Sequence, residues 1–120
     1  MAKILIVEDD ENNRELLSMY LTESGYEALA VNDGAESLEA VRHEKPDLVL
    51  MDLRMPKMNG IEATKKIKAD PDVADTPILM LTGVRDTLSY EDMYSAGAVG
   101  YLGKPVDLVA LVERVEEILK

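Results

Sequence analysis

Short apolar runs alternate with longer amphipathic stretches along the whole chain. The run over residues 4–7 is aliphatic and has no polar alternation, which is typical of a strand buried on both faces of a sheet. Further short runs predict strands over residues 27–31, 48–51, 78–81 and 99–102. The pattern therefore predicts five strands, separated by segments long enough to form helices.

The segments that follow these runs carry apolar residues at helical spacing. They predict helices over residues 12–24, 35–43, 61–69 and 87–96, and a last helix that Asp107 caps and that runs to residue 119. Gly25 and Gly97 supply stop signals for the first and fourth helices. The segment 53–60 has no period and contains proline, asparagine and glycine, so we interpret it as a surface loop.

Strand–helix units follow one another without a linker, a repeat or a low-complexity segment. They predict one α/β domain over residues 1–120. In such a domain the strands are parallel, the crossover connections are right-handed, and helices cover both faces of the sheet. No apolar run approaches the roughly 20 residues that a membrane-spanning helix needs, so we expect no membrane insertion.

Composition narrows the classes of function. The 120 residues include 13 Lys plus Arg and 24 Asp plus Glu, which gives a formal net charge of −11. This acidic excess works against direct binding to nucleic acid or to an anionic membrane surface. The chain has no cysteine and one histidine, His43, which excludes thiolate and multi-histidine metal sites. We interpret His43 as a solvated surface residue, and we expect an aliphatic core and a cytoplasmic location.

Chemically useful side chains follow the predicted strands. Carboxylates follow the first and third strands, a hydroxyl follows the fourth, and an ammonium lies beyond the fifth: Glu8, Asp9, Asp10, Asp52, Thr82 and Lys104. Parallel strands all end at the same edge of a sheet, and ligands bind there at the point where the strand order reverses. With the order 2-1-3-4-5, the first and third strands are neighbours, so Glu8, Asp9 and Asp52 are expected to converge.

Three carboxylates in one pocket repel one another unless something compensates the repulsion. Some can hold protons with raised pKa values, or a divalent cation can be shared among them. An all-oxygen cluster favours Mg²⁺, which takes one or two carboxylates with waters and phosphate oxygens. Lys104 and Thr82 could bind a phosphoryl group, and a carboxylate can itself attack phosphorus. The spacing therefore predicts an Mg²⁺-dependent phosphoryl site.

The motifs at the strand ends are similar to those of a known family. They are ILIVEDD at 4–10, PDLVLMD at 46–52, MPKMNG at 55–60, PILMLTG at 77–83 and GAVGYLGKP at 97–105. With these motifs in this order, the chain resembles the receiver domain of two-component response regulators over essentially its whole length. The resemblance implies an α/β, flavodoxin-like, doubly wound sheet of five parallel strands in the order 2-1-3-4-5, with five helices.

The resemblance also implies a phosphoacceptor and a metal site. It identifies Asp52 as the phosphoacceptor and Asp9 as a direct ligand of Mg²⁺, for which Mn²⁺ may substitute, with Glu8 acting through water. Asp52 itself and the backbone carbonyl of Arg54 complete the ligands that the protein supplies. Asp10 stays open between two roles, capping the first helix and reaching the metal.

A conformational switch is implied in the same way. Thr82 is expected to move and hydrogen-bond one phosphoryl oxygen, while Lys104 pairs with another. Tyr101 is then expected to turn inward into the space that Thr82 leaves, the alternative being static packing. The bond from Lys104 to Pro105 is expected to be cis. Val84 flanks the pocket at a position that tunes dephosphorylation.

These roles describe a phosphoaccepting receiver. The resemblance implies transfer from the phosphohistidine of a sensor histidine kinase or of a histidine phosphotransfer protein to Asp52. We expect the output to act on a separate downstream protein, because no effector segment follows Lys120 in this sequence. The chain would catalyse only its own phosphorylation and dephosphorylation, so we do not expect an enzyme with a separate substrate.

Three other interpretations fit the sequence less well. A phosphatase of the haloacid dehalogenase type needs a second aspartate two residues after the nucleophile, where this chain has Arg54. A flavin-binding protein of the flavodoxin type needs a hydroxyl- and glycine-rich loop after the first strand, where this chain has acidic residues. A degenerate receiver that only binds partners would not need the full set of pocket residues.

Overall fold

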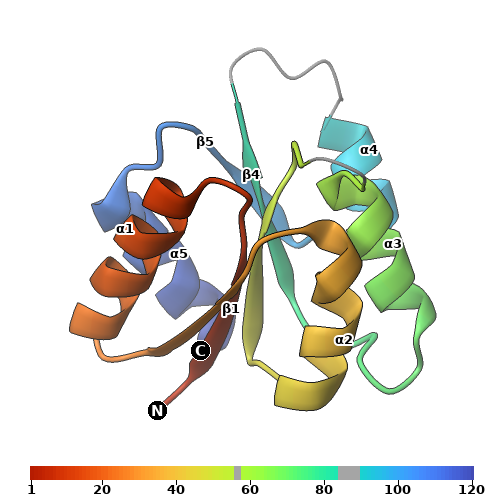
Figure 1. Ribbon diagram of the computed structural model, residues 1–120, viewed down its shortest axis with the longest axis horizontal. Helices are drawn as coiled ribbons and strands as arrows, with labels where there is room; N and C mark the ends of the chain where they lie inside the picture. The colour runs from red at the N-terminus through yellow and green to blue at the C-terminus, as the bar shows by residue number, and fades with distance from the viewer. Residues whose placement is uncertain (56–57, 84–89) are drawn as a thin grey trace.

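Parallel strands form one sheet through the middle of the molecule (Figure 1). The computed structural model describes residues 1–55, 58–83 and 90–120. The strands are β1 (Lys3–Val7), β2 (Glu27–Val31), β3 (Leu48–Asp52), β4 (Ile78–Thr82) and β5 (Gly100–Gly103). Their order is β2-β1-β3-β4-β5, and each neighbouring pair is parallel. The predicted fold class and strand order are confirmed.

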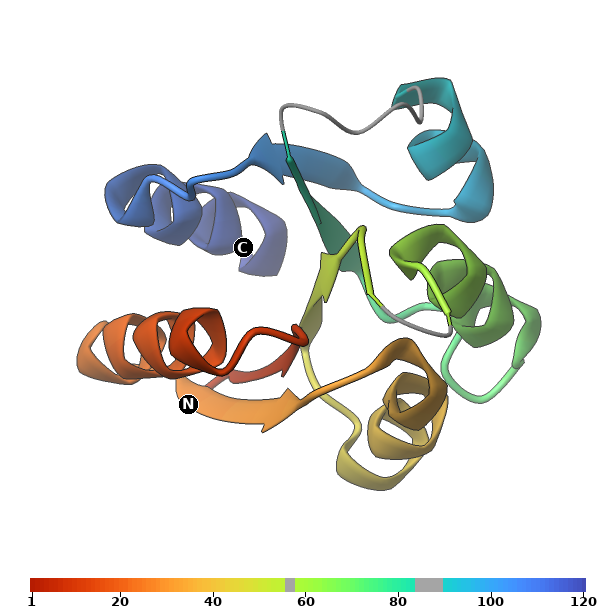
Figure 2. The same ribbon diagram turned by 45° about the horizontal axis from the view of Figure 1, so that its top comes forward.

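Helices cover both faces of this sheet (Figure 2). In the described part of the chain they are α1 (Glu11–Glu23), α2 (Gly34–Glu44), α3 (Gly60–Ala69), α4 (Tyr90–Ala96) and α5 (Leu108–Leu119). Helices α1 and α5 lie on one face, and α2, α3 and α4 lie on the other. This arrangement is the doubly wound form that the alternation of strands and helices predicts.

Each face of the sheet packs its own hydrophobic core. Alternate residues of a strand point to opposite faces, so Ile4 and Ile6 of β1 pack toward α1 and α5, while Leu5 and Val7 pack toward α2, α3 and α4. All residues of β3 and β4 are buried, as expected for central strands covered on both sides. The two cores hold the sheet rigidly, and the strand ends project from it.

Local sequence signals define most helix boundaries. The side chains of Asp33, Asn59 and Asp107 accept hydrogen bonds from backbone N–H groups in the first turns of α2, α3 and α5. Gly25 and Gly97 adopt positive φ angles of 98° and 113° just beyond α1 and α4. The cap at Asp107 and the stops at Gly25 and Gly97 lie where the sequence predicts them.

The last strand and the fourth helix differ slightly from the prediction. Strand β5 begins at Gly100 rather than Val99 and extends to Gly103, because the parallel register pairs Leu79 with Gly100 and Thr82 with Gly103. Val99 is 43% exposed although its N–H still donates to β4. Helix α4 is described from residue 90, so the predicted start at residue 87 lies outside the described residues, as does the middle of the loop 53–60.

Candidate functional site

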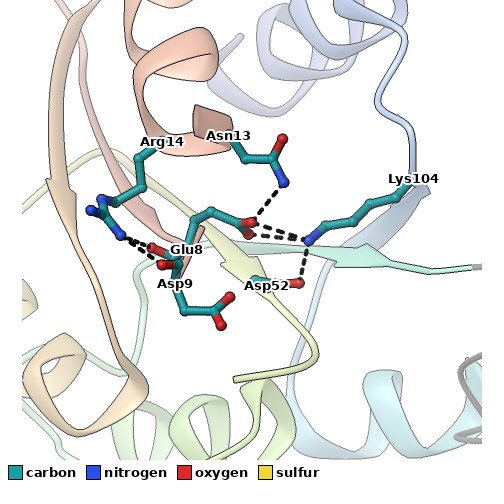
Figure 3. A network of polar contacts seen from close by, with 6 residues as sticks. All are labelled: Glu8, Asp9, Asn13, Arg14, Asp52 and Lys104. Atoms are coloured by element: carbon teal, nitrogen blue, oxygen red, sulfur yellow. Dashed lines mark hydrogen bonds and ion pairs between the residues drawn. The ribbon is translucent and has the colours of Figure 1, made fainter. Parts of the chain in front are cut away.

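Acidic side chains meet at the carboxyl ends of β1 and β3 (Figure 3). Because Val7 pairs with Met51 in the parallel register, the residues that follow them emerge next to each other. One carboxylate oxygen from each of Glu8, Asp9 and Asp52 lies within 4.8 Å of the others. Glu8 and Asp52 are buried, whereas Asp9 is exposed. The three carboxylates converge, as the strand order predicts.

A lysine that is distant in sequence enters this cluster. Lys104 follows β5, and its Nζ atom lies 2.8 Å from Asp52 Oδ1 and 3.2 Å from Glu8 Oε2 (Figure 3). Its backbone N–H donates to the carbonyl oxygen of Thr82 at 2.6 Å, which ties the residue to β4. The peptide bond from Lys104 to Pro105 is cis, as predicted. A single ammonium therefore faces two buried carboxylates.

Two residues of α1 that the sequence analysis did not single out hold the acidic pair in place. Asn13 donates from Nδ2 to Glu8 Oε1 at 3.0 Å. Arg14 donates from Nη1 to the backbone carbonyls of Glu8 and Asp9, each at 3.0 Å (Figure 3). Both residues lie in the first turns of the helix after the acidic run. Solvent-exposed polar residues are also found at such positions, so the sequence pattern does not distinguish the two cases. Only the fold shows that these side chains turn back toward the cluster.

Leu53 and Gly60, on either side of the segment that joins β3 to α3, pack close to the backbone of Asp52. The N–H of Gly60 donates to the carbonyl oxygen of Leu53 at 2.8 Å, and the N–H of Leu53 donates to Leu81 at 2.9 Å. A Cβ atom at Gly60 would lie 2.4 Å from the carbonyl oxygen of Asp52, so a side chain here would push α3 away from the strand. This close approach contributes to the burial of Asp52, which is only 2% exposed.

Burial and charge act in opposite directions on the titration of this site. Burial raises the pKa of Asp52 to about 7, with the Lys104 ammonium opposing the shift and the Glu8 carboxylate adding to it. Burial lowers the pKa of Lys104, but the hydrogen bond and charge of Asp52, together with Glu8, raise it more, so this pKa is raised overall. The cluster thus carries more negative charge than one ammonium compensates.

The donor set of this cluster fits a hard divalent cation. The converging atoms are carboxylate oxygens, the ligands that Mg²⁺ takes together with water. Asp9 is exposed, so one side of the cluster is open to solvent molecules that would complete the coordination. Across residues 1–55, 58–83 and 90–120, this is the one group of three acidic or histidine side chains that come this close together.

The two predicted switch residues lie on β4 and β5. Thr82 ends β4, is 9% exposed and pairs with Gly103 of β5. Tyr101 is half-buried, and its ring stacks on Tyr90 at the start of α4, with ring centroids 4.2 Å apart and ring planes 9° apart. A hydrogen bond with Tyr90 raises the pKa of Tyr101. Nothing in the sequence pattern pointed to Tyr90 as a partner of this ring.

The predictions for four other residues have different outcomes. Asp10 occupies the N-cap position of α1, but its side chain makes no capping hydrogen bond and does not join the three converging carboxylates. Arg54 is exposed, and the role of its carbonyl as a metal ligand stays a prediction. His43 is exposed on α2, as expected. Val84 lies outside the described residues.

A largely apolar groove lies beside the acidic cluster. It has a volume of about 430 Å³ and lies between α1 and the connection from β5 to α5. Glu8 and Lys104 contribute to its lining, which otherwise includes the apolar residues Leu16, Leu17, Leu81, Pro105, Val106 and Leu108. Leu16 is 46% exposed, so apolar surface on α1 faces solvent next to the polar cluster.

The chain is similar in sequence to response regulators. Residues 4–116 match the family model described as "Response regulator receiver domain". The DNA-binding response regulator MtrA of Mycobacterium tuberculosis is 40% identical over 118 residues, which cover 98% of this chain and 50% of MtrA. The polar-differentiation response regulator DivK of Brucella anthropi is 32% identical over 116 residues, which cover 97% of this chain and 94% of DivK.

A solved structure agrees in shape as well as in sequence. The receiver domain of a sensor histidine kinase from Pseudomonas aeruginosa, crystallised with a magnesium ion in its active-site cleft, superimposes with a TM-score of 0.90 at 30% identity. The alignment covers 98% of this chain and 97% of that one.

Coverage of the relatives and the character of the helices complete the comparison. The chain spans about half the length of MtrA and of the other curated relatives that match with similar identity. No helix among the described residues has the length and apolar character needed to cross a membrane.

Proposed function

The chain belongs to the response regulator receiver domain family of two-component signalling, and on this premise we propose that it is a phosphorylation-dependent switch whose phosphoacceptor is Asp52. The observation that carries the proposal is the convergence of Glu8, Asp9 and Asp52, two of which, Glu8 and Asp52, pair with the Lys104 ammonium. Carboxylates and an ammonium that meet at the ends of parallel strands are suited to bind a phosphoryl group, the carboxylates through a shared cation and the ammonium directly.

In the proposed reaction, a carboxylate oxygen of Asp52 attacks the phosphorus of a donor phosphohistidine. The bond from phosphorus to the ring nitrogen breaks, and the donor leaves as neutral imidazole once its other nitrogen carries a proton. The product is an acyl phosphate on Asp52. Lys104, 2.8 Å from Asp52 Oδ1, supports this step because its ammonium can move from the carboxylate to a phosphoryl oxygen.

We propose Mg²⁺ as the cofactor, with Asp9 and Asp52 as ligands, Glu8 acting through water and the Arg54 carbonyl as a further ligand. When bound, the ion would neutralise the carboxylates and the phosphoryl oxygens, and we propose Mn²⁺ as a substitute for it. The magnesium ion in the similar Pseudomonas receiver domain supports this assignment. Asn13 and Arg14 would keep Glu8 and Asp9 oriented toward the ion.

We propose that the donor is a sensor histidine kinase or a histidine phosphotransfer protein that docks on the groove beside the site. The groove combines exposed apolar surface at Leu16 with a lining that includes Glu8 and Lys104. A partner seated on it would bury that apolar surface next to the residues that surround Asp52. The assignment rests on this adjacency and on the family.

The proposed output is a change in a protein-binding surface around α4, β5 and α5. A phosphoryl group adds about −1.5 to −2 charge at neutral pH and new acceptor oxygens, which can draw Thr82 and Lys104 toward it. Tyr101 pairs with Met80, two residues before Thr82 on β4, so a movement of Thr82 would occur close to Tyr101. A separate downstream protein would then distinguish the two arrangements.

The experiment that tests this function is phosphorylation by a small acyl phosphate in the presence of Mg²⁺, followed by intact mass spectrometry. We expect one alkali-labile phosphoryl group on the wild-type chain and none on Asp52→Asn. Asp72→Asn is the matched control, because Asp72 is exposed and remote from the cluster, and it should be modified like the wild type. Modification that persists in Asp52→Asn would show that another residue is the acceptor.

A further inference from the structure

Strand β2 forms one edge of the sheet, and its outer side pairs with no other strand of the described chain (Figure 2). The N–H of Glu27 donates to Ala2, and the carbonyl of Val31 accepts from Glu8, so these residues direct their backbone polar groups toward β1. Backbone groups alternate in direction along a strand. The N–H and C=O groups of Ala28 and Ala30 therefore point to the free edge.

A second groove, with a volume of about 410 Å³, opens along this edge between β2 and α2. Its apolar lining includes Leu5, Leu29, Val31 and Ala40. Ala30 also lines it, although alternation directs the Ala30 side chain to the opposite face, so Ala30 contributes backbone. The groove thus combines an apolar floor with unpaired main-chain donors and acceptors.

The helical wall of this groove is acidic. Glu36, Glu39, His43 and Glu44 recur at helical spacing along the side of α2 that faces it. Lys3 Nζ lies 3.5 Å from Glu44 Oε1, so the charge of Glu44 is partly compensated. Glu36 and Glu39 are exposed, and neither is in an ion pair with another described residue.

We propose that this edge binds an extended basic segment of a partner protein, which adds to β2 as a sixth strand. The main chain of the segment would hydrogen-bond to Ala28 and Ala30. The aliphatic stems of its lysine or arginine residues would cover Leu29 and Val31, and their charged ends would reach Glu36 and Glu39. The site lies apart from the carboxyl-edge cluster, so the proposal does not rest on phosphorylation of Asp52.

Charge selects a basic partner over a second copy of this chain. Two copies paired through β2 would bring two acidic helical walls together, and each copy already carries a formal net charge of −11. Strand β2 has only five residues, and its first residue, Glu27, is an exposed acid. Short edge strands with charged residues commonly protect proteins against pairing between identical edges. A basic segment turns the same acidic surface into an attractive one.

The first test titrates the isotope-labelled protein with a short capped peptide of alternating threonine and arginine, and follows the backbone amide signals. We expect shifts at residues 28–31 and along α2. Glu36→Lys/Glu39→Lys should weaken binding about tenfold or more, which corresponds to about 1.4 kcal/mol. The matched control is Glu113→Lys/Glu116→Lys, which reverses two exposed charges on α5 across the sheet. It should change the affinity by less than about twofold, the size of a screened long-range charge effect.

The second test separates strand addition from simple charge attraction. Ala30→Pro removes an N–H from the free edge while keeping a φ angle that strands tolerate, so the variant should fold and lose binding. Independently, two N-methylated peptides can be compared. One carries methyl groups on its odd-numbered amides and the other on its even-numbered amides. Because only one of these sets of amides faces β2, one of these peptides should bind the wild type like the parent peptide, and the other should not bind.

Several outcomes would overturn the proposal. Equal binding by both methylated peptides, undiminished binding by a folded Ala30→Pro variant, or equal losses in the α2 and α5 charge reversals would indicate unspecific attraction to an acidic protein. Asp52→Asn should bind the peptide like the wild type, so failure of the phosphorylation proposal and failure of this one are distinguishable.

Discussion

The two halves of the carboxyl edge of the sheet are built differently. At β1 and β3, Glu8 and Asp52 are almost fully buried and share the Lys104 ammonium. At β4 and β5, Tyr101 is half-buried and rests on a ring whose residue, Tyr90, is 56% exposed. The first half is held by interlocked charges, whereas the second presents an aromatic stack that is partly open to solvent. This difference suits the proposed switch, which needs a tightly held site at Asp52 and a less constrained contact at Tyr101.

The largest effect is expected when the shared cation is removed. Lys104→Ala leaves the Glu8 and Asp52 carboxylates buried without their partner, and should lower the free energy of unfolding by about 2–4 kcal/mol in the absence of divalent ions. Chemical denaturation measures this loss, and added Mg²⁺ should restore part of it. Lys65→Ala, at an exposed position of α3, should change stability by no more than about 0.5 kcal/mol. Equal effects in both variants would contradict the contrast between the two halves.

An intermediate effect is expected from the titration of Asp52. Its pKa is raised from 3.8 to about 7 in the folded chain, so the folded state holds the proton more tightly than the unfolded state does. This linkage contributes stability that is complete below about pH 4 and is lost as pH rises through 7.

The substitution Asp52→Asn removes this dependence. In the absence of divalent ions, the variant should gain stability over the wild type as pH rises from 4 to 7, by about 1–2 kcal/mol, and the gain should then level off. Thermal unfolding across this pH range measures it, with Asp72→Asn as the control. A gain that stays constant with pH would mean that Asp52 is already ionised in acid.

The smallest effect is expected at the aromatic contact. Tyr90→Ala removes the ring that stacks on Tyr101, and should cost about 0.5–1.5 kcal/mol of stability. Side-chain NMR signals of Tyr101 should show new averaging between ring positions. Tyr94→Ala is the matched control, because Tyr94 is 50% exposed on the same helix and no ring stack is found for it among the described residues. An unchanged Tyr101 signal in Tyr90→Ala would show that the stack does not hold the ring.

The core of the carboxyl-edge cluster was predictable from sequence because it depends on topology more than on side-chain detail. Glu8, Asp9 and Asp52 follow the first and third strands, which are neighbours in the order 2-1-3-4-5 that the family resemblance implies. The roles of Asn13 and Arg14 were not predictable. A polar residue in the first turn of a helix can face solvent or turn back to a strand end, and the sequence pattern is the same in both cases.

By itself, the sequence predicted the strands, the helices and their caps, because apolar periodicity and capping residues are patterns of residues that are close along the chain. Asp33, Asn59 and Asp107 each cap a helix through a hydrogen bond that spans only two or three residues. Tertiary structure alone decided which distant groups meet. The Lys104 ammonium reaches Glu8 across 96 residues of sequence, and the free edge of β2 opens beside the acidic side of α2. Such contacts depend on how two hydrophobic cores pack the helices against the sheet, and no local pattern encodes that packing.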